Sequence, residues 1–95
     1  MESVFEISLN MKTLNGWETY GRFKLGIDEE FARSLYASLQ GNQDIFPDSV
    51  ITIDLVKREN DLLFPLAIRH CNYDQLAENV KIITKELFKR LILED

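Results

Sequence analysis

Apolar and polar residues alternate along two segments at the start of the chain. The first segment places four apolar residues on one side of an extended backbone: Phe5, Ile7, Leu9 and Met11. The second segment alternates in the same way, and one of its sides carries Trp17, Thr19, Gly21, Phe23 and Leu25. A period of two indicates strands with one buried face. The Asn15-Gly16 pair between the segments predicts a β-hairpin.

The register of this hairpin follows from matching its faces. A three-residue loop, 14–16, with Gly16 in a left-handed conformation, pairs Ile7 with Phe23 and Met11 with Thr19. The same register pairs Phe5 with Leu25, Glu6 with Lys24 and Lys12 with Glu18. It also sets Gly21 opposite Leu9, where we expect a bulge or a close backbone approach.

A helix is predicted next. Asp28 has the character of an N-cap, and Glu29 and Glu30 suit the first turn. Apolar residues at helical spacing then form one stripe: Phe31, Ala32, Leu35, Tyr36 and Leu39. We expect the helix to end with Gly41 as the C′ residue.

A second hairpin follows, with its turn near Asn60-Asp61. Ile51, Ile53 and Leu55 share one face of its first strand. The second strand has Leu62, Phe64, Leu66 and Ile68 on one face. This pattern pairs Ile53 with Ile68 and Leu55 with Leu66, and it puts His70 on the core-facing side. Pro65 cannot donate to a strand ladder, so we expect it at a sheet edge or a bulge.

The last predicted helix runs from Tyr73 to about Leu93. Asn72 is the expected N-cap, with Gln75 at the capping-box position. Its apolar stripe is narrow: Leu76, Val80, Ile83, Leu87 and Leu91. A helix of this length measures roughly 30 Å, which exceeds the roughly 17–20 Å of a typical strand. Its end should therefore extend past the sheet.

These elements predict an α+β domain with the order ββαββα. Packing is most economical as a two-layer sandwich, with a four-stranded antiparallel sheet and two helices on one face. We expect one domain over residues 1–95, with hairpin–helix units at 3–41 and 50–95 and a linker at 42–49. The order of the strands in the sheet stays open.

Charge and composition disfavour several classes of partner. The 95 residues carry a net charge of −5, which disfavours phosphate-rich partners such as nucleic acid and anionic membrane. The outer face of the first hairpin carries a candidate basic strip with Tyr20, Arg22, Lys24 and Lys12, but the interleaved Glu6 and Glu18 neutralise it. No apolar run approaches the roughly 18 residues of a membrane span, and no basic leader precedes an apolar segment. The single cysteine, Cys71, fits a reducing compartment, and we expect a cytoplasmic protein.

No catalytic, metal-binding or cofactor-binding motif is present, and no cofactor is expected. His70 and Cys71 are adjacent on a strand, so their side chains point to opposite faces and cannot act together. Cys71 suits a partly buried filler. Asp54 lies in mid-strand, where solvent or Arg69 could satisfy it. A catalytic acid is the alternative role for Asp54.

Surplus apolar residues favour an interaction surface. Some lie off the core-facing phase of the second hairpin, and others lie beside the stripe of the last helix: Val50, Val56, Leu63, Ile82, Phe88, Ile92 and Leu93. Contiguous exposed apolar surface usually marks a binding site. This pattern predicts a non-enzymatic protein–protein interaction module, acting as a homodimer or as a small accessory or adaptor subunit.

The alternative is a small-molecule-binding domain or weak enzyme. Its pocket would lie between the sheet and the helices, near Trp17, Tyr36, His70 and Tyr73. Trp and Tyr combine an apolar body with a polar group, so they often line pockets. Packing of these side chains distinguishes the two functions.

Overall fold

The predicted fold class is confirmed. The computed structural model describes residues 3–42 and 49–93 of the chain. Its elements are β1 (Val4–Thr13), β2 (Gly16–Gly26), α1 (Glu29–Ala37), β3 (Ile51–Glu59), β4 (Leu62–His70) and α2 (Tyr73–Leu93). Most of the predicted linker, 43–48, lies outside the described residues.

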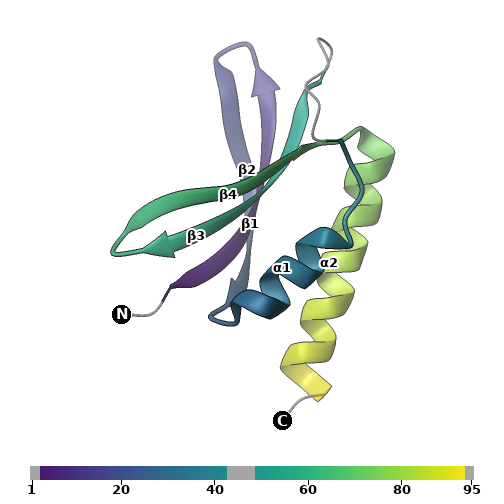
Figure 1. The fold of residues 1–95 in the computed structure, drawn as a ribbon. Helices are drawn as coiled ribbons and strands as arrows, with labels where there is room; N and C mark the ends of the chain where they lie inside the picture. Colours follow the sequence, from purple (N-terminus) through teal and green to yellow (C-terminus); the bar gives the residue numbers. More distant parts are fainter. Residues whose placement is uncertain (1–2, 43–48, 94–95) are drawn as a thin grey trace.

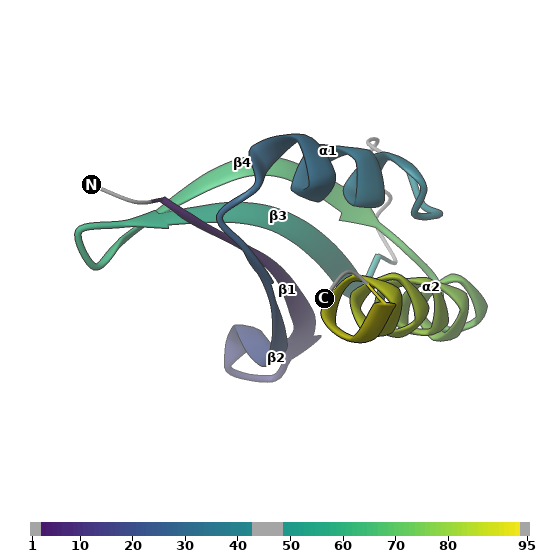
Figure 2. The same cartoon turned by 90° about the horizontal axis from the view of Figure 1, so that it is seen from below.

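The four strands form one antiparallel sheet in the order β2-β1-β3-β4. The two hairpins are therefore joined through β1 and β3, which set Ile7 opposite Leu55 and Leu9 opposite Ile53. The hairpins cross at a steep angle, so the sheet is strongly twisted (Figure 1). Both helices pack on the same side of it (Figure 2). The other side is called the open face below.

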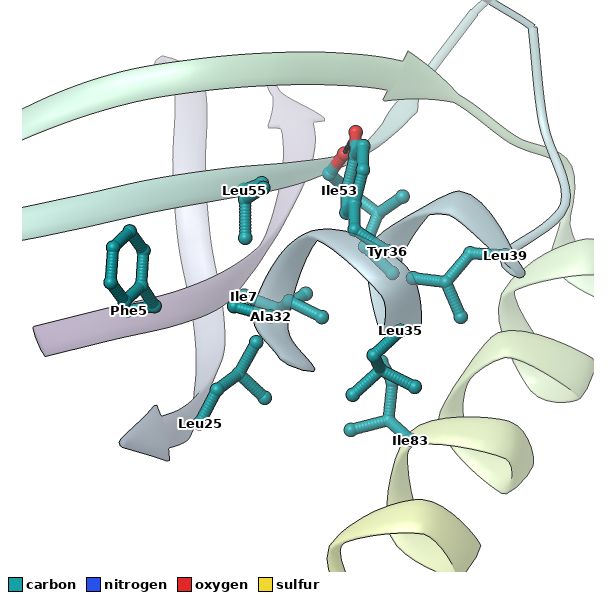
Figure 3. Packing of buried hydrophobic residues seen from close by; sticks show 10 residues of the cluster. All are labelled: Phe5, Ile7, Leu25, Ala32, Leu35, Tyr36, Leu39, Ile53, Leu55 and Ile83. Atoms are coloured by element: carbon teal, nitrogen blue, oxygen red, sulfur yellow. Dashed lines mark hydrogen bonds between the residues drawn. The ribbon is translucent and has the colours of Figure 1, made fainter. Parts of the chain in front are cut away.

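The hydrophobic core lies between the sheet and the two helices (Figure 3). Ile7 and Ile53 are completely buried there, as the alternation along both strands predicts. Tyr36 of α1 donates its hydroxyl hydrogen to the Ile53 carbonyl oxygen at 2.7 Å. Ile83 adds the contribution of α2. Each such side chain stabilises the fold by roughly 1.5–3 kcal/mol.

Helix α1 begins as predicted and ends earlier. The Asp28 carboxylate accepts a hydrogen bond from the Phe31 N–H at 3.1 Å, which caps the first turn. The helix stops at Ala37, four residues before Gly41, and Ser38 Oγ donates to the Leu35 carbonyl oxygen at 2.6 Å. Side-chain bonding of this kind competes with continued helix.

Helix α2 has the predicted capping box and length. Gln75 N–H donates to Asn72 Oδ1 at 2.8 Å, and Asn72 N–H donates to Gln75 Oε1 at 3.0 Å. These two reciprocal bonds are those of a capping box. The C-terminal turns extend past the sheet, where Leu91 is 70% exposed (Figure 1). Within the described residues, no helix combines the length and the apolar character that a membrane span requires.

The first hairpin follows the predicted register only in its centre. Gly16 is left-handed (φ 103°), and Ile7 pairs with Phe23 and Leu9 with Gly21, as expected. Beyond Gly21 the pairing shifts by one residue, because Tyr20 is an extra residue in β2. Thr19 therefore pairs with Asn10 instead of Met11, and Trp17 pairs with Lys12. Both Thr19 and Trp17 move from the core-facing side to the open face.

The strand pairing also differs from the prediction at both ends of the first hairpin. A second shift pairs Phe5 with Gly26 in place of Leu25. At the turn end, Met11 pairs with Glu18, so the predicted Lys12–Glu18 pair does not form. Gly16 pairs with Thr13, so the loop has two residues, 14–15, and the predicted three-residue loop is wrong. The predicted Glu6–Lys24 pair is confirmed.

The second hairpin contains a bulge at Pro65. The turn residues Asn60 and Asp61 have φ values of 55° and 64°, and a tight hairpin turn requires such positive values. Pairing holds the predicted register up to Val56 and Pro65, and Leu66 is then an extra residue without a partner. Pro65 thus lies both in the edge strand β4 and at a bulge, which confirms its expected position.

This bulge overturns the rest of the predicted register. Ile53 pairs with Arg69 instead of Ile68, and Leu55 pairs with Ala67 instead of Leu66. Because one inserted residue reverses the facing of every residue after it, Ile68 and His70 lie on the open face. The predicted core-facing position of His70 is therefore wrong.

Candidate functional site

The bulges at Tyr20 in β2 and at Leu66 in β4 bring residues from all four strands together on the open face. They form a groove of about 650 Å³, which we call the open-face groove. Its lining residues are Asn10, Trp17, Thr19, Thr52, Asp54, Ile68 and His70. This volume falls within the roughly 300–1,000 Å³ of small-molecule sites.

Asn10 organises the floor of the groove. Its Nδ2 donates to Thr52 Oγ1 at 3.1 Å and to Asp54 Oδ2 at 3.0 Å. Its Oδ1 accepts from Ser8 Oγ at 3.0 Å and from Thr19 Oγ1 at 2.7 Å. Both amide hydrogens and both acceptor positions of the side chain are used. The network therefore holds one side-chain orientation and links β1, β2 and β3.

Asp54 carries an incompletely satisfied carboxylate. Its Oδ1 is buried and has no hydrogen-bond partner among the described residues. Burial raises the pKa of Asp54, while hydrogen bonds from Thr52 and Asn10 and the nearby His70 act in the opposite direction. A buried polar atom without a partner costs about 1–3 kcal/mol. Unsatisfied buried groups and perturbed carboxyl groups occur preferentially at functional sites, so Asp54 is a candidate site residue.

Arg69 does not neutralise Asp54. The bulge places Arg69 on the helical face, where its Nη1 donates to the carbonyl oxygens of Tyr36 at 2.9 Å and Leu39 at 2.6 Å. Its guanidinium also stacks on the Tyr36 ring, 4.8 Å from the ring centre, in a cation–π contact. The residue opposite Asp54 is Ile68. Arg69 therefore secures the end of α1, and the expected Asp54–Arg69 partnership is wrong.

His70 is held rigidly at the end of β4. Its side chain is buried, and Nδ1 shares a 2.7 Å hydrogen bond with Ser49 Oγ. Its backbone exchanges two hydrogen bonds with Asn42, at 2.9 and 2.8 Å. Gly41 allows this approach, because a Cβ at that position would lie 2.8 Å from the His70 carbonyl oxygen. His70 pairs with Thr52, so it is the diagonal neighbour of Asp54.

Two partly exposed apolar side chains, Trp17 and Ile68, line the groove beside these polar residues. Trp17 is 47% exposed and Ile68 is 49% exposed. They come from the two edge strands, β2 and β4. An apolar rim around a few fixed polar groups is the usual composition of a ligand site.

The four predicted pocket residues separate in the structure. Trp17 and His70 line the open-face groove, which lies on the side of the sheet opposite to the predicted pocket. Tyr73 joins His70 in a second pocket of about 350 Å³ beside the start of α2. Tyr36 lines neither of these two pockets, because its side chain is buried between α1 and the sheet. The predicted site between sheet and helices is instead occupied by the core.

The described residues of the predicted interface differ in exposure and lie on different elements. Val50 and Leu63 are exposed at opposite ends of the second hairpin, whereas Val56 is 8% exposed. Ile82 packs partly buried against the core, and Phe88 is exposed on α2. Ile92 and Leu93 belong to α2, but their side chains lie outside the described residues.

The sequence analysis missed most of the groove. Asn10, Thr19, Thr52 and Ile68 were not singled out, because each is ordinary in a strand. Gly21 and Pro65 were the available signals, since both mark strand irregularities. Bulges in the two edge strands, β2 and β4, redirect side chains, and bulges of this kind are frequent beside functional sites.

Metal and thiol chemistry receive no support from the described part of the chain. It contains no cluster of three or more His, Cys, Asp or Glu residues that could hold a metal ion. Cys71 is buried, and burial raises the pKa of its thiol, which disfavours the reactive thiolate. No family model matches the chain, and comparisons with curated proteins and with solved structures gave no match.

Proposed function

We propose that this protein is a small binding domain whose open-face groove holds a small-molecule ligand. The observation that carries the proposal is the fixed polar floor formed by Asn10 and Asp54 between Trp17 and Ile68. A preorganised site binds with a smaller entropic cost, because its side chains are already ordered. Asp54 and His70 would also supply the titratable groups if the domain were a weak enzyme.

A fragment screen tests this function directly. Trp17 is the only tryptophan, so its emission reports on the groove without interference from another indole. We expect bound fragments to change Trp17 emission and to shift the amide resonances of Asn10, Thr19 and Thr52. Shifts confined to other surfaces would contradict the proposal.

Two matched variants sharpen the screen. Ile68→Arg and Leu63→Arg change similarly exposed residues of β4 on the open face, but only Ile68 lines the groove. Ile68→Arg should abolish fragment binding, because the long side chain fills the site. Leu63→Arg should bind like the wild type. Equal binding by all three proteins would sink the assignment of the groove.

The second candidate function is protein binding, as a homodimer or a small accessory or adaptor subunit. It is supported by large exposed apolar side chains at the tip of the second hairpin and on α2: Leu62, Leu63, Phe64, Phe88 and Leu91. Sedimentation velocity at micromolar concentration tests the homodimer. Leu63→Lys should disrupt self-association, because Leu63 is an exposed residue of the predicted interface. Val56 is less suitable for substitution, because it is buried within the domain. A wild-type species of 11.1 kDa at all concentrations would exclude self-association.

We also propose that the protein acts in the cytoplasm, without nucleic-acid or membrane partners. The net charge of −5 and the single buried cysteine support this location and these exclusions. Fractionation of cells that express the protein provides the test. Recovery with membranes, or with nucleic acid at low salt, would contradict it.

A further inference from the structure

The hydrogen-bonding groups of the groove define what its ligand must offer. Asn10 has no free donor or acceptor, because its four bonds are made within the protein. The Thr19 hydroxyl donates its hydrogen to Asn10 Oδ1, so it can only accept hydrogen bonds from a ligand. Asp54 has only acceptor atoms when ionised. Thr19 and Asp54 therefore present only acceptors, and a ligand that contacts them should be a hydrogen-bond donor.

The charge of the groove points the same way. Among the described residues, no Lys or Arg forms an ion pair with Asp54. Arg58, on the same face, is paired with Glu6 at 2.9 Å. Among the described residues of the lining, His70 is the other titratable one, and its Nδ1 shares a hydrogen bond with Ser49 Oγ. A cation near Asp54 would balance a negative charge that the protein solvates incompletely.

The rim adds an aromatic requirement. Trp17 lines the groove and is about half exposed, so an indole face is accessible beside the acceptor floor. Trp has the strongest attraction for cations of the aromatic side chains. Ile68 provides an apolar surface that a flat ligand body can cover.

Building on the proposed function, we propose that the ligand of the open-face groove is an organic cation with a planar apolar body. Its N–H donors face Asp54 and Thr19, and its body packs between Trp17 and Ile68. An amidinium or a protonated nitrogen heterocycle has this combination of charge, donors and shape. A carboxylate or phosphate ligand would place negative charge beside Asp54.

Three probes of nearly equal shape test the ligand class: benzamidine, benzamide and benzoate. They share a phenyl ring, and their substituents carry charges of +1, 0 and −1, respectively. Trp17 emission and amide chemical shifts give the affinity of each. We expect benzamidine to bind about tenfold more tightly than benzamide, a difference of about 1.4 kcal/mol, because its cation can interact with Asp54 and with the indole face. Benzoate should bind most weakly.

Two charge-removing variants locate the effect. Asp54→Asn preserves the size of the side chain and should remove the preference for benzamidine over benzamide. Glu18→Gln removes one charge from β2, next to Trp17 in the chain but on the other face, and should keep the preference. Thermal unfolding checks that both variants are folded. A preference that survives in Asp54→Asn would overturn the role of Asp54.

The possible failures are distinguishable. If benzoate binds at least as well as benzamidine, the cation assignment is wrong but the groove remains a ligand site. If benzamidine fails to bind at millimolar concentrations while other fragments occupy the groove, the ligand class is again overturned. If no compound of any charge occupies the groove, the proposed function itself fails.

Discussion

The side-chain amide of Asn10 donates a 3.0 Å hydrogen bond to the carboxylate of Asp54, and this contact joins the two hairpins on the open face. Asn10 lies on β1 and Asp54 on β3, and the two residues are separated by 44 positions in the chain. The same amide also donates a hydrogen bond to Thr52 Oγ1, so one side chain fixes the positions of two polar groups on the neighbouring strand.

Replacement of Asn10 should destabilise the fold. Asn10→Leu removes the amide that donates to the Thr52 hydroxyl and to the Asp54 carboxylate in a half-buried site. We expect the free energy of unfolding to fall by about 1–3 kcal/mol. Urea denaturation measures this change. Asn15→Leu, at the exposed turn of the first hairpin, is the control, and an equal loss there would refute the importance of the network.

The raised pKa of Asp54 predicts a pH-dependent stability. A carboxyl group with a higher pKa in the folded state binds protons more readily when folded, so its contribution to stability decreases as the pH rises. The decrease begins near the unfolded value of 3.8 and ends above the raised folded value. Asp54→Asn should therefore stabilise the protein at neutral pH, and the gain should vanish below pH 3.8.

The comparison of wild type with Asp54→Asn isolates this group. Asp28 and Glu59 have lowered pKa values, so they change stability in the opposite direction over an overlapping acidic range. Both groups are present in the two proteins and cancel in the difference. Urea denaturation between pH 3 and pH 7 provides the data. A difference that is constant over this range would show that Asp54 titrates normally.

Gly41 should not tolerate a side chain. Its φ is +143°, and an alanine Cβ would lie 2.8 Å from the His70 carbonyl oxygen. Residues other than glycine rarely adopt such a φ. We expect Gly41→Ala to lower stability by roughly 1–3 kcal/mol and to shift the His70 amide resonance. Gly21→Ala is the matched control, because it meets no heavy atom within 4 Å. Equal effects at both glycines would contradict the close approach.

Asn79 should be essential for the attachment of α2 to the end of α1. It is completely buried, and it bonds both the N–H and the carbonyl oxygen of Gln40, at 2.7 and 2.8 Å. Asn79→Leu would leave two backbone groups without partners, each at a cost of about 1–3 kcal/mol. Glu78→Leu, at an exposed neighbouring position, serves as the control. Equal denaturation midpoints for the two variants would disprove this role.

Local signals in the sequence were sufficient to predict the order of the helices and strands, the start of both helices and the location of both turns. Asp28 and Asn72 cap their helices, because a short polar side chain can satisfy N–H groups that the first turn leaves free. Gly16 and the Asn60-Asp61 pair adopt the positive φ values that tight hairpins need. These choices depend on a few neighbouring residues, so the chain alone determines them.

The open-face groove was decided by the tertiary structure. The sequence indicated irregularities at Gly21 and Pro65, but strand pairing selected Tyr20 and Leu66 as the extra residues. One extra residue reverses the facing of all that follow, because side chains alternate with a period of two. Trp17 and His70 thus reached the same face only when both hairpins paired in one sheet. The strand order, which makes β1 and β3 neighbours, brought Asn10 to Asp54, and no local pattern specifies that contact.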